Sequence, residues 1–452
     1  MGGGSINERF AIQFVDGCFN TIGVGEDKGS YGSLSLDPCS NAVNISYMDF
    51  ISKDIRYAYK EDSSNVWNTM TIASPGDGSN ANFIGTSITH DLSGNRHLSY
   101  VDNSNSTLKY GFGPKILSGQ SVFDISWYLF DVDPSFLSGI YSSIKVDMSG
   151  NRHISYFEDD NDILKYAFGP VNSDINSDIS WKLYEVDVST DTGWYNALAL
   201  DSSGNPHISY FDTSNNSLKY AYGNINSTSG YDSSWQIYEI DSYNPFITTP
   251  PQFSSIVVDS SGNPHISYYD GNLYNLKYAF GNIIPNSNND ISWEIYTIES
   301  DGNTGKWTSI DLNPNTQRPS ILYFKFLGSG KHEVKIASQQ TDGTWNSGVL
   351  DPSLNNVDIN GQSQIKIDSE NYYHISYYDF TNSGGRLRYA TNSQTTFGDY
   401  CNTFTPNNIN PSVNRVTRPP NLFTRIPTPV SSPPIRRLPT DPSSREIDPC
   451  PV

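Results

Sequence analysis

The chain has 452 residues and a formal net charge of −20, with 17% charged and 36% hydrophobic residues. This acidic balance argues against a nucleic-acid backbone or an anionic membrane as a partner. The sequence has no apolar run of about 18 residues, so no membrane-spanning helix is expected. No basic segment followed by an apolar one opens the chain, so no secretory signal is visible.

The N-terminal region is predicted to contain one strand. Residues 1–7 are rich in glycine and are expected to be flexible. Residues 10–16 then read Phe-Ala-Ile-Gln-Phe-Val-Asp, a run of aromatic and β-branched residues that ends in an aspartate and is typical of a strand. Its role becomes apparent from the repeats that follow.

A motif centred on Ile-Ser-Tyr is written seven times, with intervals of 53 to 58 residues between copies. The tyrosine of each copy is Tyr47, Tyr100, Tyr156, Tyr210, Tyr268, Tyr323 or Tyr377. A period this regular is typical of a repeat architecture built from one supersecondary unit.

Each copy has four segments with strand character. In the third copy they are residues 143–147, 153–157, 164–168 and 181–187, and a Ser-Gly-Asn turn joins the first two. Four antiparallel strands per unit are typical of a propeller blade. We therefore predict an all-β fold, a seven-bladed β-propeller over residues 8–398.

The fourth strand is missing from the last copy, and the N-terminal segment is predicted to supply it. Residues 10–16 match residues 235–241 of the fourth copy at the aromatic, the aliphatic residue two positions later and the final aspartate. We expect residues 9–16 to complete the last blade and close the ring.

Residues 399–452 differ in composition and are predicted to form an extended tail. They hold 12 of the 26 prolines and six arginines, which favours polyproline II structure without a packed core. One alternative is a disordered or stalk-like tail. The other is an arm that docks on its own propeller or on a neighbour.

Five repeats carry a histidine six residues after an aspartate. The pairs are Asp91 and His97, Asp147 and His153, Asp201 and His207, Asp259 and His265, and Asp368 and His374. A ring keeps the copies apart, so they cannot converge on one metal ion. We expect a structural role, in which each buried imidazole is held by the carboxylate or a carbonyl and pins its hairpin.

Aromatic residues stand two positions before the start of several first strands. They are Tyr31, Tyr141, Tyr195, Phe253 and Trp307, and Trp194, Tyr243 and Phe246 belong to the same loops. First strands line the channel of a propeller, so these residues are candidates for a partner-binding ring at its mouth. The alternative is that they only pack between blades.

The string Ser-Ser-Gly-Asn-Pro-His-Ile-Ser-Tyr-Tyr-Asp with a following Leu-Lys-Tyr-Ala resembles a repeat of secreted or surface bacterial and archaeal proteins. These repeats are grouped with sialidase-like (BNR, Asp-box) propellers, and Thr341-Asp-Gly-Thr-Trp345 is similar to an Asp-box core. The resemblance implies the fold. Sialidases also use three arginines, a tyrosine and acidic residues, and the arginines of this chain do not form that pattern.

The sequence therefore favours a non-catalytic recognition or scaffold module on a cell or virus-particle surface, which binds a protein or glycan. The alternatives are a glycoside hydrolase or lyase that uses loop carboxylates, and an assembly protein whose tail threads into neighbours. No cofactor, metal or membrane insertion is expected. Cys18, Cys39, Cys401 and Cys450 are either free thiols or paired in disulfides.

Overall fold

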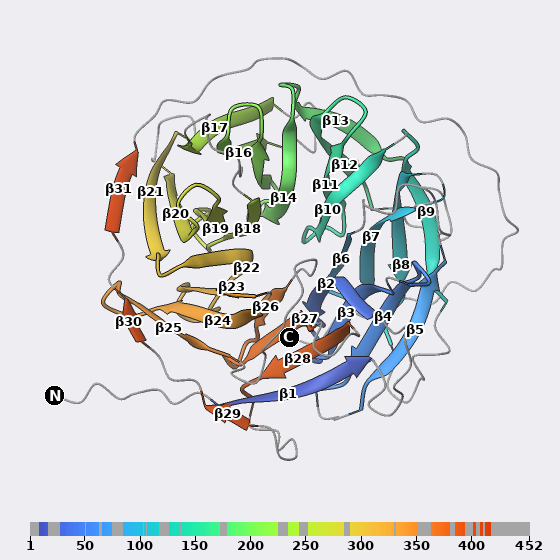
Figure 1. Cartoon of the computed structure of the whole chain (residues 1–452). Coiled ribbons are helices and arrows are strands. Elements are labelled where there is room, and N and C mark those ends of the chain that lie inside the picture. Colours follow the sequence, from blue (N-terminus) through green and yellow to red (C-terminus); the bar gives the residue numbers. More distant parts are fainter. Residues whose placement is uncertain are drawn as a thin grey trace, which may run out of the picture.

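Seven antiparallel sheets stand around a central channel in the computed structural model, which confirms the predicted seven-bladed β-propeller (Figure 1). The structure describes residues 9–16, 28–49, 51–62, 66–74, 85–102, 104, 106–116, 126–135, 137–171, 179–224, 234–243, 252–283, 290–329, 331–350, 363–379, 385–393, 401–403, 407–409 and 412–416. Within these residues every regular element is a strand, and no helix long and apolar enough to cross a membrane occurs.

The first four blades each have four strands, numbered from the channel outward. Blade 1 contains β2 (Lys28–Leu36), β3 (Val43–Asp49), β4 (Ile55–Lys60) and β5 (Asn68–Ala73). Blade 2 contains β6 (Thr86–His90), β7 (Arg96–Asp102), β8 (Thr107–Gly113) and β9 (Tyr128–Asp133). Blade 3 contains β10 (Ser138–Val146), β11 (Arg152–Glu158), β12 (Ile163–Gly169) and β13 (Lys182–Asp187). Blade 4 contains β14 (Thr192–Leu200), β15 (Pro206–Asp212), β16 (Ser217–Asn224) and β17 (Ser234–Ser242).

The last three blades each have five strands. Blade 5 contains β18 (Gln252–Val258), β19 (Pro264–Asp270), β20 (Asn275–Ile283), β21 (Ile291–Glu299) and β31 (Ser412–Val416). Blade 6 contains β22 (Asn303–Leu312), β23 (Pro319–Gly328), β24 (Lys331–Gln339), β25 (Trp345–Val349) and β30 (Asn407–Ile409). Blade 7 contains β26 (Gln364–Ile367), β27 (Tyr373–Asp379), β28 (Arg386–Thr391), β1 (Arg9–Asp16) and β29 (Cys401–Thr403).

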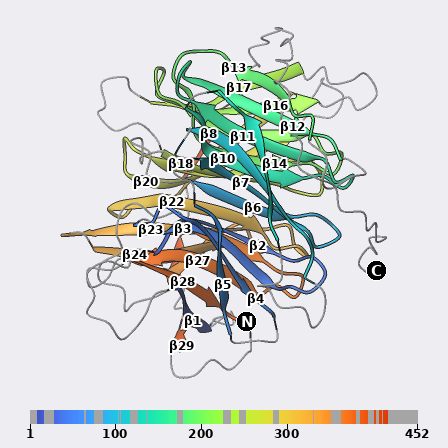
Figure 2. The same ribbon diagram turned by 90° about the vertical axis from the view of Figure 1, so that its right-hand side faces the viewer.

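The N-terminal strand closes the ring, as predicted. β1 pairs antiparallel with β28, with Ala11 opposite Thr391 and Phe14 opposite Arg388. Figure 2 shows β1 beside β28 and β29 in the side view. One sheet thus contains both the beginning and the end of the repeat array, which leaves no open first or last blade.

Three short strands of the tail lie on the outer edges of blades 7, 6 and 5. β29 pairs with β1, β30 pairs with β25, and β31 pairs with β21, all antiparallel. The tail thus adds a fifth strand to three successive blades, and β5, β9, β13 and β17 are the outermost strands of the other four (Figure 1).

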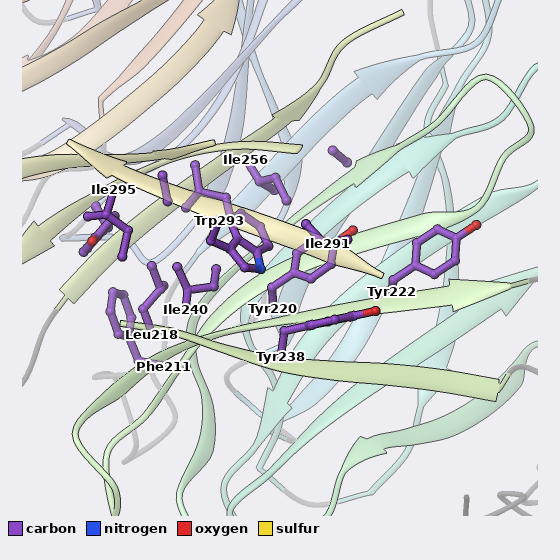
Figure 3. Packing of buried hydrophobic residues seen from close by; sticks show 14 residues of the cluster. Phe211, Leu218, Tyr220, Tyr222, Tyr238, Ile240, Ile256, Ile291, Trp293 and Ile295 are labelled. Atoms are coloured by element: carbon purple, nitrogen blue, oxygen red, sulfur yellow. The ribbon is translucent and has the colours of Figure 1, made fainter. Parts of the chain in front are cut away.

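The core lies between the blades rather than within a single layer. Both faces of a sheet are covered by neighbouring blades, so the second strands are largely buried, and β11 and β19 are buried at every residue. A tryptophan at or just before six of the outer strands packs edge-to-face on a tyrosine of the preceding blade, at centroid distances of 5.1 to 5.4 Å. Figure 3 shows one such pair, Trp293 against Tyr220.

Candidate functional site

Five aromatic residues lie at the start of first strands, where each strand enters the channel. Tyr31, Tyr141, Tyr195, Phe253 and Trp307 all have a positive φ, between 49° and 58°. The pairing register with the second strand shifts at each of these positions, as between Ile140 and Ser143. A left-handed conformation is unfavourable for a bulky residue by about 1–2 kcal/mol. Its recurrence at five equivalent positions is therefore a built feature of the channel mouth.

A glycine two residues before four of these aromatics allows neighbouring blades to approach closely. Gly29, Gly139, Gly193 and Gly305 all have a positive φ. A Cβ on Gly193 would lie 2.9 Å from the backbone of Leu164 in the preceding blade, and one on Gly305 would lie 2.8 Å from Leu276. Only glycine fits there. This Gly-x-aromatic spacing is visible in the sequence, although it was not among the predicted features.

Four of the five aromatics form a continuous arc across blades 3 to 6. The ring centroids of Tyr141 and Tyr195 are 4.6 Å apart, those of Tyr195 and Phe253 4.8 Å, and those of Phe253 and Trp307 5.0 Å. Tyr141, Tyr195 and Phe253 are half-buried, whereas Trp307 is buried. The arc therefore combines packing between blades with a partly exposed apolar surface.

The remaining candidates take different places. Trp194 extends the arc, with centroids 6.0 Å from Tyr141 and 5.0 Å from Phe157. Tyr31, in blade 1, packs on the core between blades 1 and 2. Tyr243 does not join the arc, because its hydroxyl donates to Asp241 and its ring lies under the Lys277 ammonium. Phe246 lies outside the described residues.

The arc borders a small polar cavity in the channel. The cavity measures about 100 Å³, and hydroxyl and amide side chains such as Ser142, Asn196, Ser254 and Thr308 line it beside the aromatics. Sites that enclose a small-molecule ligand measure about 300–1,000 Å³. A cavity this small has room for water or an ion, so a larger ligand would contact the rim.

Below the arc, a ring of side-chain oxygens joins each blade to the next. Ser33, Ser87, Ser143, Ser255 and Ser309 each accept a hydrogen bond from a backbone N–H of the following first strand, at 3.0 to 3.2 Å. Gln364 closes the circle by accepting from Leu34 N–H at 2.7 Å. Blade 4 alone has no such acceptor, because Ala197 stands at the equivalent position.

The tyrosines of the mouth stay protonated. Burial raises the pKa of Tyr31, Tyr141 and Tyr195, and neighbouring tyrosines add to the effect for Tyr31 and Tyr141. Their hydroxyl groups are neutral hydrogen-bonding groups, without the lowered pKa that activates a nucleophile.

The five histidines occupy the opposite end of the first hairpins, away from the aromatic arc. Each imidazole Nδ1 lies 2.6 to 2.7 Å from the hydroxyl of a tyrosine on the third strand of its own blade, such as Tyr220 for His207. Each Nε2 lies 3.0 to 3.8 Å from the aspartate six residues earlier. In blade 1, Asn44 accepts the equivalent tyrosine hydroxyl, that of Tyr57.

The electrostatics of these pairs fit a structural role. Burial lowers the pKa of His97, His153 and His207, so these imidazoles are neutral. Burial acts to raise the pKa of Asp201, but His207 and the amides of Asn205 outweigh it and lower the value to about 2. The carboxylate also accepts the turn N–H groups of Ser203 and Asn205.

A second repeated network ties blades together through the lysine of the Leu-Lys-Tyr motif. Lys277 Nζ lies 2.8 Å from Asp270 of its own blade and 2.9 Å from Asp241, which ends the preceding blade. Tyr268 also donates its hydroxyl to Asp241. Lys219 in blade 4 and Lys165 in blade 3 likewise lie between a carboxylate of their own blade and one of the preceding blade. Asp212 and Asp270 also accept hydrogen bonds from backbone N–H groups of the turns that follow them, as their positions at the ends of strands suggest. The lysine partners of these aspartates were not predicted.

No group of three or more His, Cys, Asp and Glu side chains that could hold a metal ion occurs in the described ranges. Arg96 and Arg152 lie at the hairpin end of the blades, where Arg96 Nη1 contacts the Tyr57 hydroxyl at 3.1 Å and Arg152 Nη1 donates to Pro170 O. Neither arginine is near the aromatic arc, which begins at the other end of the strands.

No protein-family model and no curated protein is similar in sequence to this chain. Its structural neighbours are sialidase-like and related β-propellers. The lectin BP39L from Burkholderia pseudomallei matches at 13% identity and a TM-score of 0.48, over 79% of this chain and 97% of that one. The polysaccharide lyase Uly1 matches at 10% identity and a TM-score of 0.46, over 82% of this chain and 90% of the lyase chain. A mutant of the NanB sialidase from Streptococcus pneumoniae matches at 12% identity and a TM-score of 0.43, over 81% of this chain and 68% of the sialidase chain. Similarity this distant says nothing about the activity of this chain.

Proposed function

We propose that the propeller is a non-catalytic recognition module on a cell or virus-particle surface and that it binds a glycan at the aromatic mouth of its channel. The observation that carries this proposal is the arc of Tyr141, Tyr195, Phe253 and Trp307, held in a strained backbone conformation beside a hydroxyl-lined cavity. Sugar rings present an apolar C–H face and hydroxyl groups, and the arc offers partners for both.

One further observation supports a location outside the reducing cytoplasm. Cys39, in the first hairpin turn of blade 1, is disulfide-bonded. Disulfides persist in oxidising compartments and on cell or virion surfaces.

The binding test removes two of the half-buried aromatics, Tyr141 and Tyr195, and keeps Trp307, whose loss would open the core beside blade 6. Ligands are first selected on a glycan array and their affinities are then measured by calorimetry. We expect Tyr141→Ala with Tyr195→Ala to lower the affinity at least about tenfold, which corresponds to about 1.4 kcal/mol. Tyr274→Ala, at an exposed aromatic outside the arc, is the control and should leave affinity unchanged.

Wild-type affinity in the double variant would overturn the assignment of the arc as the binding site. Failure of every glycan on the array, together with arc-dependent binding of a protein, would replace the glycan by a protein ligand.

The alternative function is a glycoside hydrolase or lyase, and one cluster of loop carboxylates favours it. Burial and the neighbouring Asp162, Asp160 and Asp191 raise the pKa of Asp159, which influences Tyr141 electrostatically. A raised pKa is what a general acid requires. Turnover of chromogenic glycosides that Asp159→Asn abolishes would establish this alternative.

A further inference from the structure

Below the ring of side-chain oxygens, the first strands bring one further residue from each blade to the same height in the channel. This set of seven residues, called the charged level, includes three charged side chains. Two residues after the oxygen-bearing position of each first strand stand Ser35, Thr89, Lys145, Ala199, Val257, Asp311 and Lys366. Two lysines and one aspartate are the charged residues of this level. The level is locally cationic in a chain whose net charge is −20.

Blade geometry places Lys145 across the channel from the neighbouring pair Asp311 and Lys366. Lys145 lies on β10 in blade 3, and in a ring of seven blades the opposite side lies between blades 6 and 7 (Figure 1). Asp311 is on β22 in blade 6 and Lys366 is on β26 in blade 7. The strongest charge–charge effect on Lys145 comes from Lys366, followed by Asp311.

Both carboxylate oxygens of Asp311 contact residues of blade 7. Its Oδ1 lies 3.4 Å from Lys366 Nζ, and its Oδ2 accepts a hydrogen bond from Ile367 N–H at 2.8 Å. Lys145, in contrast, makes no ion pair or side-chain hydrogen bond with any residue that the structure describes. Lys145 is half-buried in the channel. An ammonium group that loses part of its hydration without gaining a counter-ion is destabilised, so such a charge is normally paired.

We propose that this level of the channel binds one small oxyanion, held by the Lys145 ammonium group on one side and by Lys366 on the other. The ligand class is a tetrahedral or planar anion such as sulfate, phosphate or a small carboxylate. The two lysines outnumber the single carboxylate of Asp311, and the negative charge of the anion would offset this excess of positive charge. This site is independent of the glycan proposed at the mouth.

The titration of Lys145 gives the site a pH dependence. Burial, and secondarily Lys366, lowers the pKa of Lys145 to about 7, with Asp311 acting in the opposite direction. The neighbouring strands contribute no other charge at this level: His153, opposite Lys145 on β11, has its own pKa lowered by burial. Anion binding should therefore weaken as the pH rises through about 7, because the ammonium group loses its proton.

The experiment titrates sodium sulfate into the full chain by calorimetry, against sodium chloride at matched ionic strength. Sulfate keeps its charge across the pH range used, so a change in affinity reports on the protein. We expect one sulfate per chain, with an affinity at least about tenfold weaker at pH 8.5 than at pH 6, as a group with a pKa near 7 predicts.

Variants of the three charged residues separate binding from a purely structural role. Lys145→Met should abolish binding, whereas Lys145→Arg should retain it and remove the loss at pH 8.5. Asp311→Asn should tighten binding, because it removes the opposing carboxylate while the amide still fits. Lys331→Met, at an exposed lysine of β24, is the control and should bind as the wild type.

Sulfate binding that is absent from the wild type, or equal in Lys145→Met and Lys331→Met, would overturn the proposal. Weaker binding in Asp311→Asn would also contradict it, because a carboxylate that repels the anion cannot support its binding. The far-UV circular dichroism of each variant shows that the fold is retained.

Discussion

The side-chain oxygen at the second position after each mouth residue has a clear function at the residue scale. Ser143 accepts the Leu198 N–H of the next blade at 3.2 Å, and four other serines and Gln364 make the same contact around the ring. Each serine contact joins residues about one repeat apart, and the Gln364 contact joins the last blade to the first. Each of them holds one blade at a fixed rotation to its neighbour. Ala197 interrupts the series between blades 4 and 5.

This interruption gives a pair of opposite predictions. Ala197→Ser should supply an acceptor for the Ile256 N–H and raise the free energy of unfolding by about 0.5–1.5 kcal/mol. Ser143→Ala, which removes the acceptor of Leu198, should lower it by about 1–3 kcal/mol, since it leaves a buried donor unpaired. Urea unfolding followed by tryptophan fluorescence measures both. A destabilising Ala197→Ser would mean that the space beside Ala197 cannot accept a hydroxyl.

At the scale of elements, the tail strands protect sheet edges. β31 pairs with β21 from Trp293 opposite Val416 to Thr297 opposite Ser412, and β30 and β29 cover β25 and β1 in the same way. An unpaired edge presents a row of N–H and C=O groups that can pair with another chain.

Truncation after Gly398 tests this role. We expect faster amide hydrogen exchange in β21 and β25, with no change in β13, which no tail strand covers. The uncovered edges should also promote association, measurable by light scattering. Unchanged exchange in β21 would contradict the pairing. A monomeric truncated chain that has lost an assembly formed by the full chain would instead support a tail that threads into neighbours.

The sequence predicted the blades because they depend on patterns within one repeat, and it predicted the closing strand because residues 10–16 match the fourth strand of a repeat. Alternating apolar residues, the Ser-Gly-Asn turn and the terminal aspartate are local signals. It did not predict the lysine bridges of Lys277 or the serine contacts of Ser143, because both join different blades and the residues resemble ordinary surface polar groups. A tail that docks on its own propeller was one of the two alternatives from the sequence. Its strands and their partners were not predicted, since their pairing uses backbone groups and leaves no side-chain pattern.

The aromatic arc was predicted only in part. The sequence placed the residues at the channel mouth, where Tyr141, Tyr195, Phe253 and Trp307 are found. It could not decide between packing and exposure, and the structure shows both, because the positive φ turns the rings onto one another. The sequence predicted that Tyr243 joins the aromatic ring at the mouth, because of its position in the loop. In the structure its hydroxyl donates to Asp241 and its ring contacts the Lys277 ammonium group, so it lies outside the arc.

At the scale of the whole molecule, stability depends on ring closure. The five ladder pairs between β1 and β28 connect the two ends of the repeat array. Without them, blade 7 loses its outer strand, and β29 loses the strand on which it lies.

Deletion of residues 1–16 should therefore lower the free energy of unfolding by several kcal/mol, if each lost ladder hydrogen bond contributes about 1 kcal/mol. Deletion of residues 1–8 is the matched control, because it leaves β1 intact. Chemical denaturation compares the two. Equal stability of the two deletions would show that blade 7 is stable with three strands.

Ring closure also sets an order in time. Ala11 pairs with Thr391, so the strand that completes the last blade is synthesised before all seven repeats and has no partner until nearly the whole array has been made. At about 5–20 residues per second, this wait is on the order of tens of seconds. During it, β1 remains without its partner while blades accumulate behind it. A ribosome that stalls before residue 386 therefore leaves an open arc of blades, and closure of the ring distinguishes a complete repeat array from an incomplete one.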